Sequence, residues 1–108
     1  MKLAAAFHAV DWTAIAPTTH AGDPGLATWR THEHGELRAR IVAYSPGYVA
    51  DHWCQKGHVV FVLEGEIVTE LRDGRSFAAH AGQGYVVGDA DGAHRSRSEH
   101  GARLFIVD

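Results

Sequence analysis

The chain has 108 residues, of which 45% are hydrophobic and 21% are charged, and its formal net charge is -3. These values are typical of a globular protein with one compact core, and they exclude intrinsic disorder, collagen-like repeats and coiled coil. The 10 basic residues are scattered along the chain and are outnumbered by 13 acidic ones, so we expect no nucleic-acid partner.

Residues 1–25 are predicted to form an N-terminal arm followed by a loop. The first 16 residues show no clean helical or strand period, and Pro17–Gly25 is rich in residues that break regular structure. The longest apolar run near the start, Leu3 to Phe7, is too short for a signal peptide or a membrane span. We therefore expect a cytoplasmic protein without membrane contact.

The arm also bears on assembly. Phe7, Trp12 and Ile15 are apolar, and so short a segment cannot bury them against itself. A second copy of the chain is the simplest partner surface, so we expect a homodimer.

Residues 26–108 are predicted to form one all-β unit. Short runs of β-branched and aromatic residues alternate with Gly, Asp and Pro at intervals of about 8 to 12 residues, which is typical of a sandwich or barrel. The pairs Glu64–Gly65 and Asp73–Gly74 each predict a hairpin turn, because such turns require positive φ. The predicted strands are Ala27–His32, Leu37–Tyr44, Val49–Cys54, His58–Leu63, Ile67–Leu71, Ser76–Ala78, Gly84–Val87, His94–Ser98 and Arg103–Val107.

Nine histidines stand out, and three metal-capable side chains fall within seven positions. His52 and Cys54 share one face of a predicted strand, because side chains alternate along a strand. A turn at Lys56–Gly57 would bring His58 beside them, and His94 begins a later strand as a fourth donor. Three imidazoles and a thiolate suit a transition ion far better than calcium or magnesium.

A second interpretation of these residues stays open. Nine scattered histidines produce close pairs by chance, so His52 could be a buried, hydrogen-bonded residue and Cys54 an inert core thiol. Six further histidines are expected outside any metal shell: His8, His20, His32, His34, His80 and His100. Four arginines on predicted strands are expected on a solvated outer face, with an anionic ligand as the alternative: Arg38, Arg40, Arg95 and Arg97.

The segment from Gly47 to Gly65 resembles the first motif of the cupins, which contains a His-x-His pair, a glutamate and a closing glycine. In this resemblance His52 takes the first histidine position, Cys54 the second and His58 the glutamate position. His94 takes the place of the histidine in the second motif.

The run Asp51-His52-Trp53-Cys54 and the ending at residues 102–108 are similar to the small single-domain DHCW motif cupins. The resemblance covers roughly residues 26–108 and implies a small antiparallel β-barrel of jelly-roll type. It also implies one divalent transition ion on His52, Cys54, His58 and His94, with zinc favoured and iron, nickel and manganese as alternatives.

The ligand set departs from the common cupin pattern, because Cys54 and His58 replace a histidine and a glutamate. The second motif also lacks its proline, and Ser98 stands in place of its terminal asparagine. The reactions of cupins with three histidines and one glutamate therefore do not carry over.

Two functions are compatible with the sequence. The first is a metal-dependent enzyme acting on a small organic molecule, and the second is a non-catalytic barrel. In the second case a closed set of four ligands would hold a structural zinc, or the barrel would bind or sense a small ligand.

Overall fold

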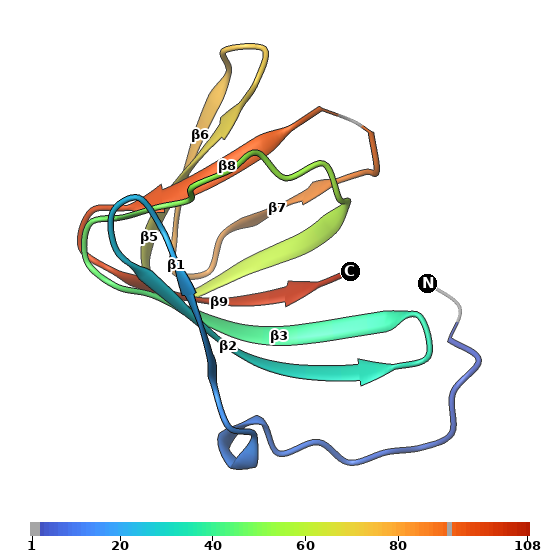
Figure 1. Cartoon of the computed structure of the whole chain (residues 1–108). Coiled ribbons are helices and arrows are strands. Elements are labelled where there is room, and N and C mark those ends of the chain that lie inside the picture. Colours follow the sequence, from blue (N-terminus) through green and yellow to red (C-terminus); the bar gives the residue numbers. More distant parts are fainter. Residues whose placement is uncertain (1–2, 91) are drawn as a thin grey trace.

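The structure is a computed structural model that describes residues 3–90 and 92–108. It contains one short 3-10 helix and β-strands that pair only in antiparallel fashion within these ranges (Figure 1). The elements are η1 (Trp12–Ala14), β1 (Thr18–Ala21), β2 (Leu26–His34), β3 (Leu37–Tyr44), β4 (Tyr48–Val49), β5 (His58–Leu71), β6 (Ser76–His80), β7 (Gly84–Val87), β8 (His94–Ser98) and β9 (Ala102–Val107).

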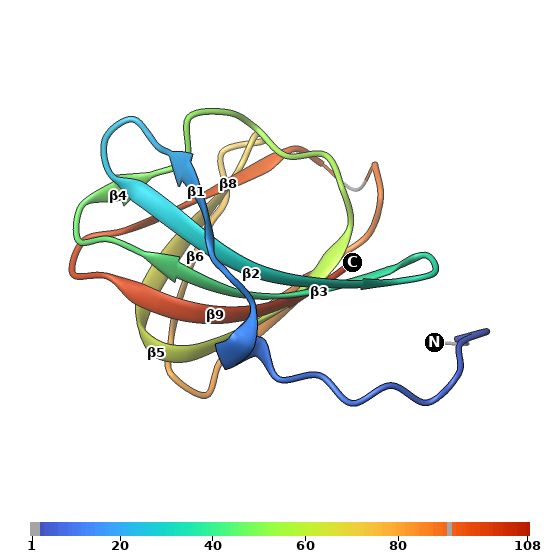
Figure 2. The same ribbon diagram turned by 60° about the horizontal axis from the view of Figure 1, so that its bottom comes forward.

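The strands form two curved layers that share β5. The first half of β5 pairs with β7 and β9, and β9 continues through β3 and β2 to β1. The second half of β5 pairs with β6 and β8, and β8 pairs with β4. Figure 2 shows the layers curving around a common interior. The predicted all-β class and jelly-roll architecture are confirmed.

The bend that lets β5 serve both layers lies at Glu64–Gly65, where the sequence predicts a hairpin turn. That prediction is wrong, because β5 runs through both residues and its register with β9 shifts between Val62 and Glu64, as in a β-bulge. Gly65 has φ +78°, and a Cβ atom there would lie 2.1 Å from the carbonyl oxygen of Gly101. A bulge and a turn both need glycine, so the residue pair alone does not distinguish them.

The second predicted turn, at Asp73–Gly74, is confirmed. It joins β5 to β6, and the amide of Leu71 donates to the carbonyl of Arg75 at 2.8 Å. Gly74 has φ +101°, and a Cβ atom there would meet nothing within 4 Å.

The core lies between the layers and is built from small and branched side chains. Alternating burial along β5 and β9 shows that every second residue points inward, as a strand with one buried face requires. Trp29, Tyr44 and Tyr85 pack against this core from the side of the open end. The buried cluster consists of Val42, Val60, Val62, Ile67, Ala79, Ala102, Leu104 and Ile106.

The arm is more ordered than its sequence predicts. Part of the expected loop forms β1, which pairs with β2, because extended Thr and His residues there complete the edge of the layer. Trp12 donates from Nε1 to the carbonyl of Ala39 at 3.3 Å and packs edge-on against Phe105. Arg30 donates to the carbonyls of Thr13 and Ile15, which fastens η1 to β2.

Trp12 thus packs on the outer face of its own chain and is half-buried there, so Trp12 alone does not require a partner chain. Phe7 differs, since it is 96% exposed.

No helix in the described parts of the chain is long and apolar enough to span a bilayer.

We predict that Gly65→Ala destabilises the fold by about 3 kcal/mol or more, because it combines left-handed backbone strain with a clash against Gly101. Gly74→Ala is the matched control, since it has the same sign of φ but open space, and it should cost about 1 to 2 kcal/mol. Urea unfolding followed by tryptophan fluorescence measures both. Equal losses in the two variants would show that the close approach at the bulge does not matter.

Candidate metal centre

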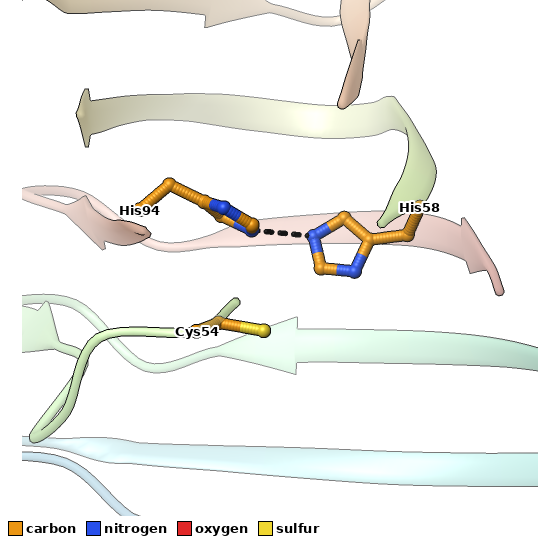
Figure 3. A group of neighbouring side chains, drawn as sticks. All are labelled: Cys54, His58 and His94. Carbon is orange, nitrogen blue, oxygen red and sulfur yellow. Dashed lines mark hydrogen bonds between the residues drawn. The ribbon is translucent and has the colours of Figure 1, made fainter. Parts of the chain in front are cut away.

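Three of the predicted donors converge at the open end of the barrel. His58 is the first residue of β5 and His94 the first residue of β8, so the two come from different layers. Cys54 and His94 form an isolated antiparallel β-bridge. The Cys54 amide donates to the His94 carbonyl at 2.7 Å, and the His94 amide donates to the Cys54 carbonyl at 2.9 Å. This bridge places the Cys54 and His94 side chains next to each other (Figure 3).

The donor atoms of Cys54, His58 and His94 all lie within 4.8 Å of one another. The Nε2 atoms of His58 and His94 are 2.8 Å apart. Two nitrogen lone pairs cannot face each other at this distance without repulsion, so a proton or a cation must lie between them. In the metal-free chain one ring therefore donates to the other.

The opposite ring nitrogens face acceptors. His94 Nδ1 lies 3.4 Å from the carbonyl oxygen of Gly92, and His58 Nδ1 lies 3.6 Å from Oδ2 of Asp108. If a metal ion displaced the shared Nε2 proton, these acceptors would favour a proton on Nδ1 of each ring, and both Nε2 lone pairs would then face the ion. Such acceptors behind ligand histidines are common at metal centres. The donor set therefore fits a transition ion.

Electrostatics keep His58 neutral. Burial, reinforced by the nearby His94, lowers the pKa of His58 to about 4, although Asp108 opposes this shift. Burial alone would raise the pKa of the Asp108 carboxyl, but the hydrogen bond from Arg38 and the charges of Arg40 and Arg38 outweigh it and hold that pKa below its usual value. Neutral imidazole is the form that binds metals.

Asp108 sits at the centre of a cationic cluster. Arg38 binds it with two hydrogen bonds, of 2.8 and 3.0 Å, and Arg40 adds a third at 3.1 Å. Lys56 Nζ lies 3.8 Å from the same carboxylate. Asp108 thus connects the arginines on β3 to the His58 ring.

His52, the fourth predicted donor, is not brought into this group. Its side chain is 78% exposed, and its Nδ1 lies 2.6 Å from Oδ1 of Asp51. The reasoning that placed His52 and Cys54 on one strand was wrong, because β4 ends at Val49 and backbone bonds to β8 continue only at Ala50 and then at Cys54. The residues between them form a loop, where side chains no longer alternate.

A cavity of about 230 Å³ lies beside the three donors. Arg38 and Arg40 line it, so the expectation of a solvated outer face is wrong for these two residues, whereas Arg95 alternates with the buried His94 and Ser96, pairs with Glu70 and reaches only the edge of the cavity. Inward and outward positions differ by a single residue of register, and polarity alone assigned Arg38 and Arg40 to the wrong face. Tyr85 also lines the cavity, and its ring centroid lies 6.3 Å from that of His58.

One residue beside the candidate donors, Asp108, was missed in the sequence. Asp108 was overlooked because it stands far from the histidines along the chain, and only the pairing of β9 with β3 and β5 brings it near. Trp53, the residue before Cys54, packs with its ring under the guanidinium of Arg95 at 4.5 Å.

The six histidines expected to lie outside the metal shell are absent from the three-donor group. His8 stacks on His32 at 5.0 Å between centroids, on the outer surface near the arm. His20 stacks on Trp29 at 3.7 Å.

No protein-family model and no curated protein matches the chain. Among solved structures, an RmlC-like cupin from Shewanella frigidimarina is 20% identical with a TM-score of 0.74, and the match covers 97% of this chain and 92% of that one. Protein NMB1881 from Neisseria meningitidis is 25% identical with a TM-score of 0.61, over 73% and 79% of the two chains. Ectoine synthase from P. lautus is 18% identical with a TM-score of 0.63, over 75% and 62%. The chain therefore has the cupin fold.

We predict that the metal-free protein loses stability as the pH falls from about 6.5 towards 4. The pKa of His58 is lower in the folded than in the unfolded chain, so the unfolded chain binds the proton more tightly in this window. The loss of stability due to His58 is absent above pH 6.5, grows as the pH falls and reaches at most about 3 kcal/mol below pH 4. Urea unfolding in the presence of a chelator measures it. His58→Gln should remove this part of the acid sensitivity and His100→Gln should not, and an identical pH slope in all three proteins would contradict the assignment.

Proposed function

We propose that the protein is a metal-binding small cupin in which Cys54, His58 and His94 hold one divalent transition ion. The observation that carries this proposal is the convergence of three metal-capable side chains, whose donor atoms all lie within 4.8 Å of one another. A thiolate and two imidazoles favour zinc, with iron, nickel and manganese as alternatives.

We propose further that the ion serves an enzyme acting on a small organic molecule. Three protein donors leave a coordination position free, as in catalytic rather than structural zinc sites. The ion, when bound, would polarise a substrate oxygen or activate a water molecule. Asp108 would orient the His58 ring from behind, and the barrel interior would exclude bulk water.

The alternative is a non-catalytic barrel with a structural zinc or a ligand-sensing role. A structural centre needs a fourth protein ligand, and His52 in the adjoining exposed loop is the predicted candidate. Ectoine synthase shares the fold, but a fold hosts many unrelated chemistries and does not choose between the alternatives.

We also infer that the chain is one of the DHCW motif cupins, on the strength of the run from Asp51 to Cys54. In support, this segment supplies one metal donor, Cys54, and a tryptophan packed under a cavity arginine. We place the protein in the cytoplasm, where its one thiol, Cys54, would remain reduced.

We predict that protein from metal-replete cells carries about one transition ion per chain. Cys54→Ser, His58→Gln and His94→Gln should each weaken metal retention by about tenfold or more, because each removes a donor. His100→Gln, an exposed histidine outside the group, is the control. Elemental analysis after dialysis gives the result, and less than about a tenth of an equivalent after reconstitution with zinc and iron would rule out the site.

Cobalt substitution separates the two functions within the same experiment. A sulfur-to-cobalt charge-transfer band that disappears in Cys54→Ser would support thiolate ligation. With an open position, azide should shift the cobalt d–d bands, and His52→Asn should leave them unchanged. Cobalt d–d bands that do not shift with azide but do change in His52→Asn would favour the structural centre.

We propose that the chain forms a homodimer through the outer face of β5 and its neighbours. Val59, Phe61 and Leu63 alternate on this face and are exposed, and the exposed Val86 lies opposite Val59. Phe105 lies opposite Phe61 and extends the apolar surface towards the arm. Contiguous apolar surface of this kind is a common sign of an interface.

Phe61→Lys should therefore shift the protein from dimer to monomer, because it places a charge at the centre of the apolar face. Phe77→Lys is the matched control, since Phe77 is equally exposed at 44% but lies on β6 in the other layer. Light scattering over a range of concentrations measures the mass. A wild-type chain that remains monomeric at high concentration would end the proposal.

A further inference from the structure

The cavity contains buried hydrogen-bond donors without partners. Among the described residues, three buried side-chain atoms lack a hydrogen bond: Arg40 Nε, His58 Nδ1 and Arg95 Nε. All three residues line the cavity beside the metal donors. A buried donor without an acceptor costs free energy, and such atoms are rare unless a ligand or water completes them. The arginine donors therefore call for a ligand that carries an acceptor.

The charge of the cavity wall indicates what kind of acceptor this is. The described wall includes no acidic side chain, whereas four cationic ones line it: Arg38, Arg40, Lys56 and Arg95. Behind the wall, Asp108 offsets part of this charge, and Glu70 lies 3.6 Å from Arg95 and also pairs with Arg97. Positive charge remains in excess inside the barrel, which favours an anion.

Arg40 is the best placed anchor. Its side chain is only 6% exposed, and its guanidinium lies 4.3 Å from the ring centroid of Trp29. Stacking on Trp29 and the bond to Asp108 hold the planar group in one orientation. A guanidinium held in this way matches the two oxygens of a carboxylate.

Aliphatic side chains form part of the remaining wall, and the space is small. The cavity volume of about 230 Å³ is smaller than that of cavities that bind drug-sized ligands. Inorganic phosphate offers nothing to bury against such a wall, whereas a carboxylic acid with a compact hydrocarbon part does. The apolar wall comprises Val42, Val60, Leu104 and Ile106.

We propose that this cavity binds a small carboxylic acid as its carboxylate, with Arg40 as the anchoring residue and the hydrocarbon part against the apolar wall. Because Arg40 lines the same cavity as Cys54, His58 and His94, the bound molecule would lie beside the ion. In naming a substrate class the proposal rests on the proposed function, but the binding itself is tested without activity.

Calorimetric titration of the full chain with three probes tests the binding. Isobutyrate carries the carboxylate, isobutyramide has the same shape without charge, and inorganic phosphate carries charge without an apolar part. The expected order of affinity is isobutyrate first, with the amide weaker by about tenfold or more. Each titration is run on metal-loaded and on metal-stripped protein.

Two variants of Arg40 are compared, so that the test does not depend on one variant being folded. Arg40→Met removes the charge, and Arg40→Lys retains a charge near Asp108 while removing the planar group and its Nε donor. Both should weaken isobutyrate binding by about tenfold or more. Arg103→Met is the control, because Arg103 is half exposed, pairs with Glu64 and does not line the cavity. Thermal unfolding confirms which variants are folded.

The outcomes separate this proposal from the metal site. Arg40-dependent binding of isobutyrate in metal-stripped protein supports the carboxylate site even if no ion is ever retained. Equal affinity for isobutyrate and isobutyramide overturns it, as does phosphate binding more tightly than isobutyrate. Binding that needs the metal and is unchanged in Arg40→Lys also overturns it, since the ion rather than the arginine would then hold the carboxylate.

Discussion

The bend of β5 at Gly65 is the constraint on which the rest of this structure depends. A strand from His58 to Leu71 can belong to both layers only if it turns sharply without losing its hydrogen bonds, and the bulge at Glu64–Gly65 provides that turn. The backbone of Gly101 approaches so closely that no side chain fits. Through this bend, β5 carries His58 in one layer while its other half pairs with the strand that begins at His94.

The convergence of the three candidate donors follows from that arrangement, because they come from both layers and from the loop between β4 and β5. His58 and His94 begin strands of different layers, and their Nε2 atoms lie 2.8 Å apart. The bridge between Cys54 and His94 ties the loop to β8 at the one point where the thiol is needed. A metal ion held across the two layers would also reinforce the barrel, since metal binding is coupled to folding.

The interior departs from an ordinary apolar core on the side that faces the centre. Arg40 and Asp108 are both buried, and burying charges is costly unless they are paired. The hydrogen bond from Arg40 helps to satisfy the Asp108 carboxylate, but the Nε–H group of Arg40 has no acceptor. Proteins commonly accept such costs at functional sites, where a ligand completes the interaction.

Comparison with the solved cupin structures shows that the barrel fold does not depend on a particular sequence. The RmlC-like cupin matches almost the whole chain at 20% identity, so the barrel tolerates extensive change in sequence. A barrel of this kind needs inward apolar positions and a few special glycines rather than particular side chains. The fold therefore leaves the polar groups that line the cavity free to differ between cupins.

Sequence alone determined the all-β class, most strand positions and three donors that the structure brings together, because alternation and glycine placement are local properties. Strands such as Leu37–Tyr44, Gly84–Val87 and His94–Ser98 match their predictions residue for residue. Local patterns could not decide whether Glu64–Gly65 was a turn or a bulge, nor which way Arg40 faced. Both depend on the register between strands distant in sequence, as does the approach of Asp108 to His58. His52 lies outside the donor group for a related reason: its segment pairs with β8 only at its ends, and only the tertiary structure shows where that pairing stops.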